Sequence, residues 1–180
     1  MDTSPQDVIA FWRQAGPRRW FARDATFDAA CAARFLAAHH AAARGELEHW
    51  MSDAQGALAL LILLDQIPRN VFRGSAHAFA GDGLARACAR RAIEAGFDAR
   101  TEPLLRPFFY LPFEHSEDPA DQERALALFG ALPGKDPGKW ARLHADIIRR
   151  FGRFPHRNAA LGRTSTPEEQ AFLDAGGFTG

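Results

Sequence analysis

The amino-acid sequence predicts an all-α protein whose antiparallel helix pairs are joined by short loops. A serine, an aspartate or a threonine precedes a proline at four places, which is the pattern of an N-cap residue followed by proline at the first helical position. The four pairs are Ser4-Pro5, Asp118-Pro119, Asp136-Pro137 and Thr166-Pro167. Apolar residues recur at helical spacing after these signals, and no stretch alternates as a strand between hairpin turns does.

The N-terminal half contains three predicted helices. The first starts after Ser4, and the second carries Phe27, Cys31 and Phe35 on one face and should end at Gly45. The third is "DAQGALALLILLDQ", which begins at residue 52 or 53 and is apolar almost all round. A helix that is apolar on every side needs neighbours on every side, so we expect it to be the central buried helix.

The C-terminal half contains the remaining helices. We expect them over about 83–95, 119–131, 138–151 and 167–175, with a short aromatic helix in 102–113 that Pro107 and Pro112 interrupt. Thr166 and Glu169 have the spacing of a capping box, in which each side chain binds the other residue's backbone amide. The paired histidines His39-His40 are expected on a solvated helix face.

Composition limits the class of protein. A chain of 180 residues predicts one domain, 1–180, and its formal net charge of zero argues against a general binder of nucleic acid or membrane surfaces. Cys31 and Cys88 lie in alanine-rich helical contexts and are interpreted as buried, reduced thiols. The segment "MDTSPQDVIAFW" lacks the basic and apolar regions of a signal peptide, so we expect a cytoplasmic protein. No oligomeric state is predicted.

Three segments carry most of the polar chemistry: "LDQIPRNVFRG" (64–74), "YLPFEHSEDPADQE" (110–123) and "RRFGRFPHRNAALGR" (149–163), the last preceded by a histidine at 144. Residues 113–123 hold five acids and no base, whereas 149–163 hold five arginines and no acid, so we expect these two segments to meet. The first and third also share a Pro-Arg-Asn pattern, allowing for one inserted histidine. We therefore predict that Arg69, His115, His156 and Arg157 surround one cavity.

The candidate residues divide by chemistry. Arginine forks bind carboxylates and phosphates bidentately, asparagines fix orientation, and histidine and tyrosine can transfer protons. The ligand-binding candidates are Asp65, Gln66, Arg69, Asn70, Arg73, Tyr110, Ser116, Arg153, His156, Arg157 and Asn158, and the acid–base candidates are His115, Glu117 and His144. A purely structural interpretation competes, because acids near a helix start and arginines near a helix end are favoured by the helix dipole.

Other chemistries have little support in the sequence. No HExxH or paired CxxC motif occurs, and arginines would repel a cation, so no metal is expected. A GxSxG elbow, a P-loop and a dinucleotide fingerprint are also absent from the sequence, and no other cofactor is predicted.

The three segments resemble the signatures of the bacterial domain-of-unknown-function family 924. The likeness runs from "VIAFW" to "AFLDAGGF", and the three motifs occur in the family's order. It implies an all-helical fold similar to tetratricopeptide (TPR) repeats. Ile67 stands where the family usually has an aromatic residue. The resemblance also implies motif positions at Asp65, Gln66, Arg69, Asn70, Arg73, His115, Ser116, Glu117, His144, Arg153, His156, Arg157 and Asn158.

Two functions compete on these observations. The first is a TPR-like binding module that holds an anionic small molecule or an acidic peptide end in a pocket of arginine, histidine and asparagine. The second is a small enzyme in which His115 or His144 is the acid–base group, Glu117 orients it, and the arginines hold an anionic substrate. A purely structural polar core is the third interpretation.

Overall fold

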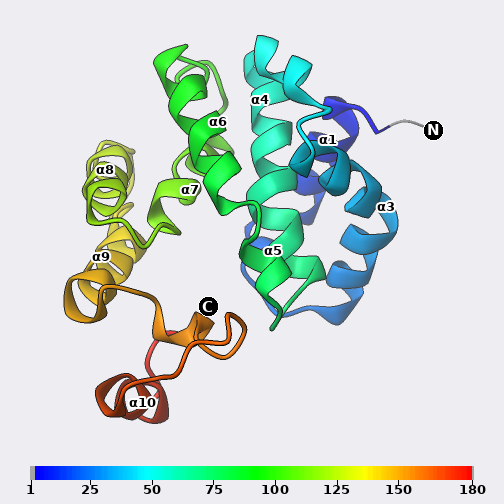
Figure 1. Cartoon of the computed structure of the whole chain (residues 1–180). Coiled ribbons are helices and arrows are strands. Elements are labelled where there is room, and N and C mark those ends of the chain that lie inside the picture. Colours follow the sequence, from blue (N-terminus) through cyan, green and yellow to red (C-terminus); the bar gives the residue numbers. More distant parts are fainter. Residues whose placement is uncertain (1–2, 180) are drawn as a thin grey trace. The chain divides into compact units, whose positions relative to one another are not determined.

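The structure is a computed structural model that describes residues 3–179 (Figure 1). Every regular element in that range is helical, which confirms the all-α prediction. Its contacts divide it into two compact units, one of residues 1–73 with 77–112 and one of residues 74–76 with 113–180. The TPR-like superhelix and the single domain stay predictions. Within the described range, no helix is both long and apolar enough to cross a membrane.

The first unit is built around one central helix, residues 54–71, in which two α-helical segments are joined by a π-helical turn. Its elements are α1 (Pro5–Ala15), α2 (Pro17–Trp20), α3 (Ala25–Ala43), a 3-10 turn (Glu48–Ser52), α4 (Ala54–Leu61), a π-helical turn (Ile62–Gln66), α5 (Ile67–Val71), a 3-10 turn (Ala76–Phe79), α6 (Asp82–Glu94) and a 3-10 turn (Arg106–Phe109). α4 packs against α1 and α6, and α3 packs against α5. Residues 57–64 are at most 2% exposed, which confirms that "ALALLILL" is buried.

The second unit contains α8 (Pro119–Gly130), α9 (Lys139–Phe151), a 3-10 turn (Pro155–Arg157) and α10 (Pro167–Asp174); α7 (Leu111–Glu114) spans the boundary of the two units. α8 packs on α9, and α10 packs on the 3-10 turn. Buried Ile147, Ile148 and Phe154 form the centre of a small core, against which Phe172 and Phe178 pack.

Three of the four predicted N-caps are confirmed. The Ser4, Asp118 and Thr166 side chains each accept a backbone N–H of the first turn, and Thr166 forms the expected capping box with Glu169. The prediction at Asp136 is wrong: α9 begins at Lys139, and the Asp136 carboxylate pairs with the Arg142 guanidinium instead.

The central helix widens at residues 62–66, where the N–H of Ile67 reaches back five residues to the carbonyl of Ile62. Proline at 68 has no N–H to donate, so regular α-helical bonding cannot continue through this turn. The carbonyl of Leu63 is left to another donor, and His39 Nδ1 lies 2.8 Å from it. His39 is 3% exposed, so the prediction of a solvated face is wrong for this residue.

Candidate functional site

The motif residues of the first unit are held in ion pairs. The Arg69 guanidinium lies 3.1 Å from the Asp65 carboxylate and makes a bidentate pair with Asp82 at 2.8 and 3.0 Å. Burial lowers the pKa of Arg69, but the carboxylates of Asp65 and Asp82 outweigh it and raise that pKa above its ordinary value. Arg69 is therefore a fixed cation that joins the π-helical turn to the first turn of α6.

Arg73 has an equally complete set of partners. It makes a bidentate pair with Asp28 of α3 at 2.6 and 2.9 Å and donates to the Asn70 side-chain oxygen at 2.8 Å. The Asn70 amide in turn donates to the carbonyl of Gln66 at 3.0 Å. The pair of Arg73 and Asp28 ties the turn after α5 to α3.

Tyr110 donates its hydroxyl to the Asp98 carboxylate at 2.8 Å. Burial, together with that carboxylate, raises the pKa of Tyr110 well above its ordinary value. Such a phenol stays protonated across the physiological range, so its contact with Asp98 is a neutral donor's bond to a carboxylate.

In the second unit the acidic and arginine-rich segments meet, as the sequence predicted. Arg163 makes a bidentate pair with Glu117 at 2.7 and 2.9 Å, and Arg149 lies 2.8 Å from Glu123. Burial raises the pKa of Glu117. Hydrogen bonds from Arg163 and from the Phe154 N–H together lower it by more than burial raises it, so the net shift is downward. Glu117 thus anchors the arginine-rich loop instead of orienting a histidine.

Arg153 is also engaged by an acid. It makes a bidentate pair with Glu169 of α10 at 2.6 and 2.8 Å and donates to the carbonyl of Thr164. The Glu169 carboxylate additionally accepts from the Asn158 amide at 3.2 Å and from the Thr166 N–H at 2.7 Å. Hydrogen bonds from Arg153 therefore hold the pKa of Glu169 at about 2, although burial opposes this shift.

The three candidate histidines lie close together, and two of them pack on two phenylalanines. This arrangement is named here the histidine cluster: His115, His144, His156, Phe154 and Phe178. The His115 and His144 ring centroids are 6.3 Å apart. Phe154 lies 5.4 Å from the His144 ring and 5.5 Å from the His156 ring, and Phe178 lies 4.6 and 5.2 Å from the same two rings. Among residues 3–179, no group of three His, Cys, Asp or Glu side chains is arranged to hold a metal ion.

The carboxylate beside the cluster belongs to Glu114. Its Oε1 lies 3.4 Å from His144 Nδ1, which is also 2.8 Å from the carbonyl of Trp140. Because a carbonyl only accepts, Nδ1 carries the proton and Nε2 is the basic nitrogen of the neutral ring. His144 and Glu114 are 5% and 4% exposed. A buried imidazole oriented by a carboxylate is an arrangement used in general acid–base catalysis.

The Arg157 side chain lies against this cluster, and two contacts fix the orientation of its guanidinium plane. Its guanidinium stacks on the Phe154 ring, 4.6 Å from the centroid, and donates to the carbonyl of His115 at 2.9 Å. Ser116, the neighbouring candidate, donates its hydroxyl to Asp121 at 2.8 Å instead. Since Arg157 and Arg69 belong to different units, their convergence on one cavity stays a prediction.

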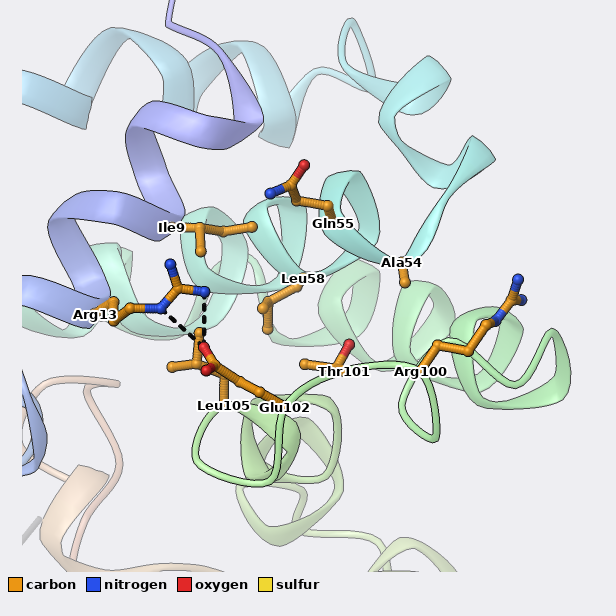
Figure 2. A pocket seen from close by; sticks show the side chains of 9 residues that line it. All are labelled: Ile9, Arg13, Ala54, Gln55, Leu58, Arg100, Thr101, Glu102 and Leu105. Atoms are coloured by element: carbon orange, nitrogen blue, oxygen red, sulfur yellow. Dashed lines mark hydrogen bonds and ion pairs between the residues drawn. The ribbon is translucent and has the colours of Figure 1, made fainter.

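A separate hollow of about 230 Å³ lies in the first unit and contains none of the predicted residues (Figure 2). Its polar edge is the Arg13–Glu102 pair, and its floor includes Ile9, Leu58 and Leu105. These three side chains are only 1–3% exposed, so a ligand would cover little apolar surface there. This hollow is therefore a weak candidate for binding an apolar ligand.

Several important residues had weak signals in the sequence. Three acids pair with predicted arginines from other segments of the chain: Asp82, Glu169 and Asp28. Each acid lies in the first turn of a helix, where the helix dipole already favours an acid. Phe178 lies in "GGFTG", which has no motif character. Glu114 stands next to His115 in the acidic segment, so the sequence indicated its neighbourhood but not its partner.

Over residues 3–179 the protein is all-helical, and its second unit places Arg157 against a cluster of histidines. The chain belongs to the family described as bacterial protein of unknown function (DUF924), whose model matches residues 8–177. It is similar to the solved structure of ATU0120, a protein of unknown function from Agrobacterium tumefaciens, with 51% identity and a TM-score of 0.92 over 95% of this chain and 97% of that one. No curated protein matches this chain.

Proposed function

We propose that this protein binds an anionic small molecule, or the carboxylate end of a peptide, at the histidine cluster of its second unit. The observation that carries the proposal is the placement of the His144 and His156 imidazoles against the Phe154 ring, with the Arg157 guanidinium stacked on the same ring. A guanidinium plane presents paired donors that match a carboxylate or a phosphate, and imidazoles become cationic in mildly acid solution.

The fixed orientation of the Arg157 guanidinium supports Arg157 as the anion-holding residue. Arg157 is oriented by an aromatic ring and a carbonyl. A side chain that is fixed before its ligand arrives loses little conformational entropy on binding.

The test is anion-dependent thermal stability of the full chain. Phosphate, sulfate and succinate are added in turn, and an anion at about 100 times its Kd should stabilise the fold by about 2.7 kcal/mol. Arg157→Gln should abolish the shift, whereas Arg149→Gln, which alters an exposed arginine of the same unit, should keep it. A wild-type protein whose melting temperature responds to none of the three anions would contradict the proposal.

The pair of His144 and Glu114 favours a second candidate, an acid–base enzyme acting on an anionic substrate. In this reaction His144 Nε2 would take or give the proton, and Glu114 would stabilise the imidazolium. A panel of phosphate and carboxylate esters, followed by mass spectrometry from pH 5 to 9, tests it. His144→Gln should abolish turnover; equal turnover by wild type and variant would contradict catalysis by His144.

We place this function in the cytoplasm. Cys31 and Cys88 are buried free thiols, and free thiols are typical of a reducing compartment, which supports the placement. Fractionation of cells that express the full chain tests it, and recovery from the secreted fraction would contradict it.

A further inference from the structure

His144 and Arg157 are the buried side chains of the proposed site, and Phe178 is one of the residues that contact the His144 ring. His144 and Arg157 are 5% and 6% exposed, so a ligand cannot reach either side chain unless something moves. The Phe178 ring stands edge-on to both His144 and His156, with interplanar angles of 68° and 82°. It is itself only partly buried, so it has solvent on its other side.

The segment that carries Phe178 is attached by few bonds. α10 ends in a turn in which Gly176 has φ +77°, and Gly176 and Gly177 donate their N–H groups to the carbonyls of Leu173 and Phe172. Residues 177–179 belong to no helix. The contacts of Phe178 with His144, with His156 and with the core of Ile147, Ile148 and Phe154 therefore hold the segment in place.

Gly177 allows the chain to take this path. A Cβ at position 177 would lie 2.6 Å from the Phe172 ring and 2.6 Å from the Phe172 carbonyl oxygen. Any side chain at that position would push the backbone away from α10 and lift Phe178. The position of the Phe178 ring thus depends on a close approach that only glycine permits.

We propose that Gly176–Phe178 is a displaceable strap, whose Phe178 ring covers the histidine cluster and leaves it when a ligand enters. The inference rests on the proposed function, because it assigns to the same site a closed and an open state. Local opening is cheapest where few backbone hydrogen bonds and few contacts must be broken, and this segment meets that condition. The strap would make binding depend on opening, so any change that weakens Phe178 packing should raise ligand affinity.

Histidine reactivity measures the opening directly. The full-length protein is treated with diethyl pyrocarbonate, and modification of each histidine is followed by peptide mass spectrometry. Phe178→Ala removes the cover, and Gly177→Ala displaces it with Phe178 intact. Both should raise the modification rates of His144 and His156 by about tenfold, because the rate follows the population of the open state. Buried His39 in the first unit is the internal control and should stay unreactive.

Two results would overturn the strap. One is that His144 and His156 react at the wild-type rate in both variants. The other is that the modification rate of His39 rises as much as the rates at the cluster, which would mean that the whole protein is destabilised. Phosphate-dependent melting of the same proteins separates this inference from the proposed function. If His144 and His156 react faster in the variants but phosphate does not change the melting temperature, the strap is supported and anion binding is rejected. If phosphate raises the melting temperature but both variants react at the wild-type rate, only the strap is rejected.

Discussion

The imidazole of His39 donates from Nδ1 to the main-chain carbonyl of Leu63, over 2.8 Å, at the turn where the central helix widens. The π-helical turn and the proline at 68 leave that carbonyl without its usual helical donor. A buried carbonyl that lacks a partner destabilises the fold, so α3 supplies a side chain from the neighbouring layer. This contact fixes the tautomer of His39 and ties α3 to the core helix.

The first prediction concerns the pH dependence that His39 creates. Burial lowers the pKa of His39, so the native protein holds it neutral while the unfolded chain takes up a proton near the ordinary pKa of about 6.5. Its contribution to stability is therefore present above that pH and is lost as the pH falls below it. Urea unfolding from pH 5 to 8 should show a shallower slope for His39→Gln than for wild type. His40→Gln, a change at a partly exposed neighbour, is the control; an unchanged slope in the His39 variant would contradict the assignment.

The second prediction concerns the core helix. Leu60→Ala and Leu63→Ala each remove a side chain that is at most 2% exposed, and the cavity should cost about 2–5 kcal/mol of unfolding free energy. Leu104→Ala, at a side chain that is 48% exposed, should stay within about 0.5 kcal/mol of wild type. Chemical denaturation measures all three, and a loss below about 1 kcal/mol at both buried positions would be inconsistent with a packed core there.

The third prediction concerns the contact between α6 and the π-helical turn. A Cβ on Gly81, the residue before α6, would lie 2.6 Å from the Leu64 carbonyl oxygen, whereas a Cβ on Gly83, inside α6, would meet nothing within 4 Å. Gly81→Ala should therefore cost about 1–3 kcal/mol by forcing the helices apart. Gly83→Ala should stabilise the fold by about 0.4–1 kcal/mol, because alanine has less freedom in the unfolded chain. Equal melting temperatures for the two variants would mean that the close approach is absent in solution.

The fourth prediction concerns Glu169, whose pKa is held at about 2 by hydrogen bonds from Arg153. A carboxyl group with a lowered native pKa stabilises the fold above its ordinary pKa of 4.5, and that stability is lost as the pH falls from there toward 2. Arg153→Gln should flatten this part of the stability curve, as should Glu169→Gln. Glu168→Gln, at the exposed neighbouring acid, should leave it unchanged. Unfolding measured from pH 2.5 to 6 decides the matter, and parallel curves for wild type and Arg153→Gln would count against the pair.

Local sequence signals determined where most helices begin and end. The Ser4, Asp118 and Thr166 caps act within one helical turn, so neighbouring residues suffice to predict them. The signal at Asp136 did not produce a cap: α9 begins at Lys139, and the Asp136 carboxylate pairs with Arg142, six positions along the chain. The widened turn at 62–66 was not predicted, because proline at 68 interrupts an α-helix without specifying how the backbone responds.

The sequence also determined that the acidic and arginine-rich segments meet, since opposite charges were concentrated in separate stretches of the chain. Which acid binds which arginine was decided by the tertiary structure alone. Glu117 lies beside Arg163, and Glu114, not Glu117, lies beside His144, although the two glutamates are three residues apart. Such pairings depend on how α8, α9 and the loop after α9 pack. A side chain's partner across forty residues is set by the geometry of the helices between them, which no local pattern records.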